Sequence, residues 1–165
     1  MNYVVEALSK QHDREAFDCG EPALNQFLRQ YARQNAERGL GKTFVAVMPG
    51  EKEVCGYYTM SSGSISFAIV PETLPRYPIP TIHLGRLAVD LKMQGQRLGD
   101  LLLIDALRRT VLIAAEVGIY AVELYALNDK AKRFYMKYGF LPLKDDDGHL
   151  YLPLETIKQS GLVTA

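Results

Sequence analysis

A glycine-bearing turn between an apolar strand and an apolar helix is the part of this sequence best suited to binding a charged ligand. The turn is Gln94-Gly95-Gln96-Arg97-Leu98-Gly99, and it lies between a strand that ends at Val89 and the apolar run 101–104. The first backbone N–H groups of a helix lack partners inside the helix and carry the positive end of its dipole. Glycine allows a positive φ and a close approach of ligand to backbone. Taken alone, the stretch fits an anion site and an ordinary strand-to-helix turn equally well.

The composition bounds the class of protein. A chain of 165 residues can bury its own core, so we expect one domain over residues 1–165. With 19 basic and 19 acidic residues, net charge favours no class of partner. Two cysteines are too few for a disulfide framework and indicate a reducing compartment. No signal peptide and no run of about 18 apolar residues is evident, so we expect a cytoplasmic protein without a membrane partner. We predict no metal site.

Hydrophobic periodicity predicts a mixed α/β fold with the order β-α-β-β-β-α-β-α-β-β. Strands are expected at 3–8, 43–48, 53–60 (continuing extended over 61–70), 81–89, 119–127, 140–143 and 149–154. Helices are expected at about 22–39, 100–116 and 128–138, with a proline-rich loop over 71–80 and a short or frayed helix from Glu155. The strand-turn-helix-strand order over 81–127 predicts parallel pairing of its two strands, and 43–60 reads as a hairpin.

Three stretches of this chain resemble the GNAT (GCN5-related N-acetyltransferase) superfamily. Gln94 and Gly99 fit the family's cofactor loop, Gln/Arg-x-x-Gly-x-Gly/Ala, although Arg97 stands where glycine is usual. The segment from Asn128 to Phe140 resembles N-x-x-A-x-x-x-Y-x-x-x-G-F, and 87–89 resembles the strand that pairs with the pantetheine arm of acetyl-CoA. The resemblance implies the GNAT fold, with a mostly antiparallel sheet of about seven strands, a central β-α-β crossover and flanking helices. It also implies acetyl-CoA as cofactor.

A narrower resemblance covers nearly the whole chain. Residues 17–20 (FDCG), 24–28, 43–46 and 84–90 look like the GNAT toxins of bacterial type II toxin–antitoxin pairs. This resemblance implies acetylation of the α-amino group of aminoacyl-tRNA, which blocks translation. It implies a ribbon-helix-helix antitoxin encoded adjacently, operator DNA bound only through the antitoxin complex, and a homodimer. Two alternatives stay open: a GNAT enzyme acting on a small amine or a protein N-terminus, and a GNAT-fold binding protein without turnover.

The resemblance also assigns roles to residues. The expected cofactor-binding residues are Leu87, Ala88, Val89, Gln94, Gly95, Gln96, Arg97, Leu98, Gly99, Asp100 and Asn128. Arg97 either reaches a phosphate of the cofactor or points to solvent, and Asn128 is both a helix cap and a cofactor contact. Tyr135 is the candidate general acid, because a phenol with a pKa near 10 stays protonated and can donate to a thiolate whose thiol has a pKa of about 8.5. Core packing of Tyr135 is the alternative, and Tyr138 is the weaker candidate acid.

The acceptor amine is constrained by the bases available. An α-amino group has a pKa of about 8 or below, whereas a lysine side chain, near 10.4, would need a strong base. No base is obvious in the sequence. Glu123 and His83 are the best guesses, and each more often has a structural role. The lack of a clear base favours an α-amine substrate.

Basic side chains gather locally despite the zero net charge. Lys130, Arg133 and Lys137 follow a helical spacing that places them on one face of the helix that carries Tyr135. Further basic residues that could extend this surface are Arg29, Arg33, Arg76, Arg86 and Lys92. We take Arg76, Arg86, Lys130, Arg133 and Lys137 as candidate contacts for tRNA phosphates. The alternatives are ordinary solvated helix faces and a surface for an acidic antitoxin tail.

Overall fold

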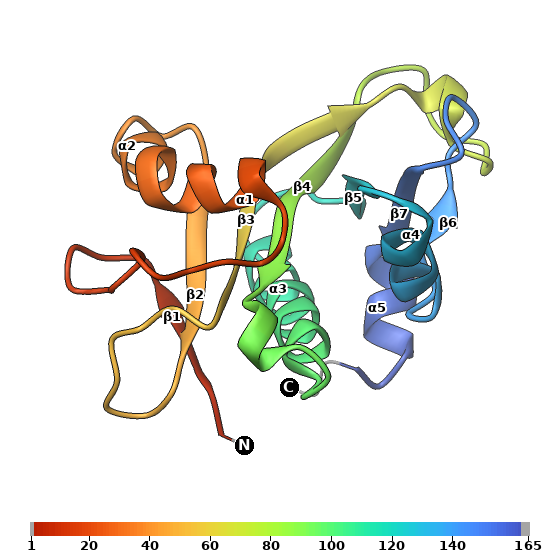
Figure 1. Ribbon diagram of the computed structural model, residues 1–165. Helices are drawn as coiled ribbons and strands as arrows, with labels where there is room; N and C mark the ends of the chain where they lie inside the picture. The colour runs from red at the N-terminus through yellow and green to blue at the C-terminus, as the bar shows by residue number, and fades with distance from the viewer. Residues whose placement is uncertain (1, 163–165) are drawn as a thin grey trace. The chain divides into compact units, whose positions relative to one another are not determined.

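A computed structural model of the protein describes residues 2–162 and contains a seven-stranded sheet in the order β1-β2-β3-β4-β5-β7-β6 (Figure 1). The strands are β1 Val4–Ala7, β2 Lys42–Val47, β3 Gly56–Ile65, β4 Ile79–Val89, β5 Ala121–Tyr125, β6 Leu141–Pro142 and β7 His149–Pro153. Strand β1 pairs with β2, β2 with β3, and β7 with both β5 and β6, all antiparallel. The pairing of β4 with β5 is parallel. The predicted mixed sheet, its hairpin and its central crossover are therefore confirmed.

The helices also follow the predicted order. They are α1 Pro22–Gln26, the π-helix η1 Phe27–Tyr31, α2 Ala32–Glu37, the 3₁₀ turns η2 Phe67–Ile69 and η3 Leu91–Met93, α3 Leu98–Ala114, α4 Asp129–Met136 and α5 Leu154–Gln159. The expectation that 61–70 stays extended is wrong beyond Ile65. The Ser66 hydroxyl accepts a hydrogen bond from the Ala68 N–H at 3.1 Å, and this local bond turns the chain.

The described residues form two compact units. Unit one comprises residues 2–61 and 85–106, and unit two comprises residues 62–84 and 107–162. The elements β3, β4 and α3 each contribute residues to both units. The core of unit one includes Phe17, Phe27, Leu28, Val45 and Tyr57. The core of unit two includes Ile65, Val70, Ile79, Ala121, Leu143 and Tyr151.

A glycine in unit one allows the start of α3 to pack against the strands. A Cβ atom at Gly56 would lie 3.0 Å from the Ala88 carbonyl oxygen, 3.0 Å from a Leu102 methyl and 3.2 Å from a Leu98 methyl. Leu98 and Leu102 are almost completely buried. The missing side chain of β3 thus makes room for the first turns of α3, which follow the glycine-bearing turn.

We expect Gly56→Ala to lower the free energy of unfolding by about 1–3 kcal/mol, because a methyl group there overpacks a filled interior. Gly118→Ala is the matched control, since no atom lies within 4 Å of its added Cβ. Urea unfolding of both variants measures the difference. Equal stability of the two variants would contradict this account of Gly56.

Candidate functional site

The end of β4 in unit one is held by a buried carboxylate. Asp90 is only 3% exposed, and its two oxygens accept hydrogen bonds from the N–H groups of Asp18 at 3.2 Å and Lys92 at 2.9 Å. The Leu91 N–H donates to the Asp18 carbonyl oxygen at 2.8 Å. Burying a carboxylate is costly unless it accepts hydrogen bonds, so these donors make the arrangement stable. Asp90 therefore fastens the chain before the candidate cofactor loop to the turn at 17–20.

The turn at 17–20 is itself braced by side chains. Asp18 accepts hydrogen bonds from the Gly20 N–H at 2.9 Å and from the Asn25 side chain at 3.0 Å, and these lower the pKa of the Asp18 carboxyl group. The Asn25 side-chain oxygen accepts from the Cys19 N–H at 2.9 Å. The Gln94 side-chain amide donates to the Val89 carbonyl oxygen at 3.1 Å. The FDCG segment thus supports the loop structurally.

The candidate cofactor loop contains two residues in the left-handed region. Gly95 has φ +85°, and Arg97, the one non-glycine residue with positive φ among residues 2–162, has φ +64°. An L-residue there costs roughly 1–2 kcal/mol. The Arg97 side chain is 82% exposed, and its Nε lies 3.9 Å from a carboxylate oxygen of Asp100. Arg97 therefore keeps the backbone conformation suited to glycine while its guanidinium is exposed, and its contact with a phosphate of the cofactor stays a prediction.

The remaining candidate cofactor residues of unit one surround this loop. Ala88 is buried in the core of the unit, and Leu87 and Val89 on either side of it are half-buried. The Gln96 side-chain oxygen accepts a hydrogen bond from the Tyr3 hydroxyl at 2.9 Å, a contact with a distant residue that the sequence does not indicate. Leu98, Gly99 and Asp100 form the first turn of α3. Residues 87–89 and 94–100 are thus all in unit one.

Asn128 and Tyr135 belong to unit two. The Asn128 side-chain oxygen accepts a hydrogen bond from the Ala131 N–H at 2.8 Å, which confirms the predicted helix cap of α4. The Tyr135 side chain is 8% exposed, and its ring makes edge contacts with Phe134 and Phe140 at centroid distances of 5.2 Å and 5.5 Å. Burial raises the pKa of Tyr135, so its phenol is protonated at neutral pH. Core packing is confirmed, and the acid role stays a prediction.

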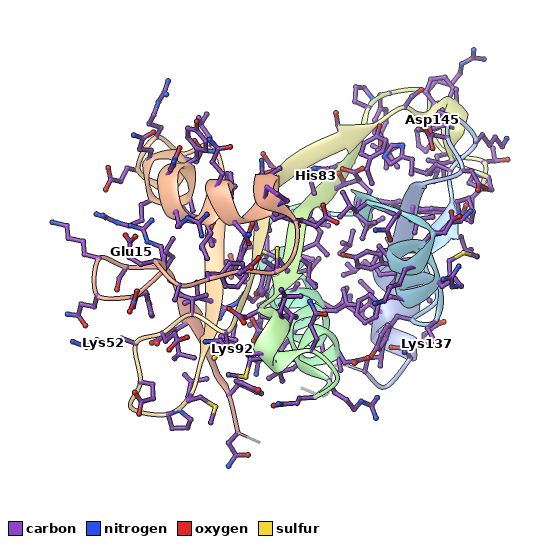
Figure 2. The ribbon with its side chains drawn as sticks, in the orientation of Figure 1. Glu15, Lys52, His83, Lys92, Lys137 and Asp145 are labelled. Atoms are coloured by element: carbon purple, nitrogen blue, oxygen red, sulfur yellow. The ribbon has the colours of Figure 1, made fainter. Side chains whose placement is uncertain are left out.

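The candidate tRNA contacts differ in their local surroundings. On α4, Lys130, Arg133 and Lys137 are exposed, and Lys137 is labelled in Figure 2. Elsewhere, the Arg86 guanidinium lies over the Phe27 ring at 3.5 Å, and that of Arg76 over the Phe67 ring at 5.4 Å. Of the other basic residues, Arg29 donates to the Phe17 carbonyl oxygen, Arg33 pairs with Glu37, and Lys92 pairs with Glu53. Each of these three therefore has a local structural partner.

The two candidate bases, His83 and Glu123, lie together in unit two and belong to a longer chain of titratable groups. His83 Nδ1 is hydrogen-bonded to one oxygen of Glu123, and His149 Nε2 lies 2.6 Å from the other. His149 Nδ1 lies 2.9 Å from an Asp145 carboxylate oxygen. We call these four residues the carboxylate–imidazole chain. His149 and Asp145 were not predicted, because only the pairing of β5 with β7 brings them to Glu123.

The pKa of Glu123 reflects two opposing influences. Burial is the largest single influence and disfavours the carboxylate, but the hydrogen bonds and charges of His83 and His149 together outweigh it and lower the pKa. Glu123 is 5% exposed. The carboxylate is therefore the ionisation state that the surroundings favour.

Comparison with known proteins identifies the family. A model of the Acetyltransferase (GNAT) domain matches residues 39–142, a range that contains both the glycine-bearing turn and α4. This chain belongs to the GNAT acetyltransferase family. A relative described as a tRNA-acetylating toxin, from Mycobacterium tuberculosis, is 39% identical over 148 residues, which are 88% of each chain.

Two solved structures of the toxin AtaT are also similar to this GNAT chain. One is AtaT complexed with acetyl-methionyl-tRNAfMet, with a TM-score of 0.89 and 31% identity, covering 95% of this chain and 98% of the other. The second is a mutant AtaT toxin bound to the C-terminus of the antitoxin AtaR and acetyl-CoA, with a TM-score of 0.85 and 30% identity, covering 98% and 99%. Within residues 2–162, none of the helices is both long and apolar enough to span a bilayer.

The left-handed backbone at Arg97 has a measurable consequence for stability. We expect Arg97→Gly to be at least as stable as the wild type, because glycine adopts a positive φ without steric cost. We expect Arg97→Val to lose about 1–2 kcal/mol, because a β-branched residue is strongly disfavoured at positive φ. Urea unfolding at neutral pH measures both. A valine variant as stable as the glycine variant would rule out the strain.

The lowered pKa of Glu123 predicts a pH dependence of folding. A carboxyl group whose folded pKa lies below its unfolded value contributes stability above the unfolded value, near 4.3, and loses it as pH falls through the folded pKa. We therefore expect Glu123→Gln to be less stable than the wild type at pH 7, and the difference to shrink below about pH 4. Unfolding free energies measured across this range test the sign, and a difference that grows towards low pH would contradict it.

Proposed function

We propose that this GNAT acetyltransferase is the toxin of a type II toxin–antitoxin pair and acetylates the α-amino group of aminoacyl-tRNA, which blocks translation. The observation that carries the proposal is the similarity to a tRNA-acetylating toxin, which extends over 88% of both chains. The similarity to AtaT complexed with acetyl-methionyl-tRNAfMet supports the same substrate class. A small amine or a protein N-terminus as acceptor is a distinguishable outcome of the experiment below.

Acetyl-CoA is the proposed acetyl donor. The residues proposed to bind it are 87–89, 94–100 and Asn128, as the family resemblance assigns them. The structure of unit one suits this role, because the loop with Gly95 and Arg97 at positive φ leads directly into the 17-residue helix α3. Its first N–H groups are donors that suit a pyrophosphate. Acetyl-CoA in the solved AtaT complex supports the assignment.

Tyr135 is the proposed general acid. Transfer of an acetyl group from a thioester to an amine leaves a thiolate, which needs a proton. A buried phenol that stays protonated at neutral pH can supply it. Exposed Lys130, Arg133 and Lys137 on the same helix, together with Arg76 and Arg86, are the proposed contacts for tRNA phosphates.

The organisation and partners follow as further parts of the proposal. Residues 1–165 act as one GNAT domain, since β3, β4 and α3 each contribute to both units. The partner is a ribbon-helix-helix antitoxin encoded adjacently, in line with AtaT bound to the C-terminus of AtaR. Operator DNA is bound only through that complex. The site of action is the cytoplasm, where charged tRNA is found, and the toxin is a homodimer.

Incubation with labelled acetyl-CoA and charged tRNA tests both the acetylation of aminoacyl-tRNA and the acid role of Tyr135. We expect the wild type to label the aminoacyl group and Tyr135→Phe to be slower by about 10²–10⁴-fold with unchanged acetyl-CoA affinity, since only the proton donor is lost. Tyr138→Phe, two residues after the end of α4, is the matched control and should keep full activity.

Three outcomes would contradict parts of the proposal. Label on a free amine or a protein N-terminus, and none on aminoacyl-tRNA, would rule out aminoacyl-tRNA as the substrate. No binding of acetyl-CoA at all would indicate a GNAT-fold binding protein without turnover. Full activity of Tyr135→Phe would remove Tyr135 from the acid role while leaving the substrate assignment intact.

A further inference from the structure

One face of strands β4, β5 and β7 in unit two carries titratable side chains beside apolar residues of the core. In the register of β4, β5 and β7, His83 lies opposite Glu123, and Tyr125 lies opposite His149. Side chains of a strand alternate between faces, so these residues share one face. The opposite face carries the buried apolar side chains of Ile82, Val122, Leu124, Leu150 and Leu152. The face with Glu123 also carries Ala121 and Tyr151 of the unit-two core, so titratable groups and apolar core residues share it.

The two imidazoles of this face both contact the Glu123 carboxylate. Both nitrogens of His149 face carboxylates, Glu123 on one side and Asp145 on the other. An ionised carboxylate only accepts hydrogen bonds, so Nε2 of His149 donates to Glu123, whose lowered pKa favours the carboxylate. His83 likewise donates from Nδ1 to Glu123, which leaves its Nε2 as an acceptor when the ring is neutral.

His83 and Asp145 are the two partly exposed ends of the carboxylate–imidazole chain. One third of the His83 side chain is exposed, whereas Glu123 and His149 are buried. Among residues 2–162, Glu123 is the partner with which His83 forms a polar contact. From β3, Gly63 lies close by, and a Cβ there would be 3.3 Å from the His83 Cβ and 3.6 Å from Glu123 Oε1. The glycine therefore allows β3 to pass close to His83, which is labelled in Figure 2.

We propose that His83 Nε2 is the general base that takes the proton from the acceptor amine, and that Glu123, His149 and Asp145 position it and hold its charge. The inference rests on the proposed acetyltransferase function. His83 precedes by four residues the part of β4 assigned to the pantetheine arm. An imidazole is the side chain whose ordinary pKa lies nearest neutrality, which suits an α-amine with a pKa of about 8. The Glu123 carboxylate faces the imidazolium that forms, in the manner of carboxylate–histidine pairs in other enzymes.

The proton balance of the reaction is complete with these groups. The ammonium form of the acceptor gives one proton to His83 Nε2, and its lone pair attacks the thioester carbonyl carbon. The new C–N bond forms, the C–S bond breaks, and the leaving sulfur takes a proton from Tyr135. The nitrogen loses its second proton as the amide forms, which restores the Tyr135 phenol, and His83 passes its proton to solvent. One acetylated amine, one free thiol and one proton result.

The test is the pH profile of single-turnover acetyl transfer to charged tRNA between about pH 6 and 8.5. We expect His83→Gln to be slower by about 100-fold at pH 7, with acetyl-CoA affinity unchanged, because the proton acceptor is lost. The defect should shrink towards pH 8.5, where much of the α-amine is already neutral. His12→Gln is the matched control: it removes a histidine whose Nε2 contacts a carboxylate at 3.1 Å in unit one, and it should match the wild type.

A second pair of variants keeps the inference testable even if His83→Gln does not fold. Asp145→Asn removes a negative charge from the chain, and we expect the pH–rate profile to move to lower pH because the imidazolium form loses stabilisation. Asp147→Asn removes the same charge from the same turn, but Asp147 contacts Lys132 and lies 86% exposed, so its profile should not move. The groups facing His83 are Glu123 from β5 and, through it, His149 from β7 and Asp145 from the turn.

The outcomes separate the two proposals. A wild type that binds acetyl-CoA but acetylates no charged tRNA at any pH would overturn the proposed function and this inference with it. An active wild type whose pH profile is unchanged in His83→Gln would overturn the base assignment alone. Identical profiles for Asp145→Asn and Asp147→Asn would remove Asp145 and His149 from the positioning role.

Discussion

The buried carboxylate of Asp90 is the constraint on which the candidate cofactor loop depends. Asp90 directly follows β4, and its oxygens accept hydrogen bonds from the N–H groups of Asp18 and Lys92. One side chain therefore joins the end of the strand, η3 and the turn at 17–20. A carboxylate buried to this degree is tolerated only with such donors. The Asp18–Asn25 contact then ties α1 to the same point. The loop that begins at Gln94 thus starts from a strand end that is fixed on two sides.

The strain in the loop follows from this fixed frame. Arg97 is held at φ +64°, a conformation that costs an L-residue roughly 1–2 kcal/mol. Strained backbone persists where the surroundings over-determine it, and such positions gather at ligand sites. The GNAT family usually has glycine at this position of the loop. Arg97 therefore keeps the backbone conformation that the loop needs, and its exposed guanidinium adds a positive charge to the loop surface.

The sequence predicted what is local and missed what depends on tertiary pairing. Strand and helix order, the parallel crossover and the Asn128 cap follow from periodicity and from single capping residues. The turn at Ser66 was missed because a strand-like alternation over 65–69 hides a hydroxyl that competes for the backbone. His149 was missed for a different reason, since it is twenty-six residues from Glu123 and meets it only through the register of β5 with β7.

The energetic cost of burying the carboxylate–imidazole chain in unit two favours a chemical role for it. Replacing a buried ion pair by well-packed apolar residues is often neutral or stabilising, so such groups are weak evidence of a contribution to stability. Here Glu123, His83 and His149 lie on one face of β4, β5 and β7, and Asp145 contacts His149 from the turn before β7. Glu123 contacts both imidazoles, so its removal would break both contacts at the buried centre of the chain. The exposed end at His83 is a point where a further proton can enter or leave the chain.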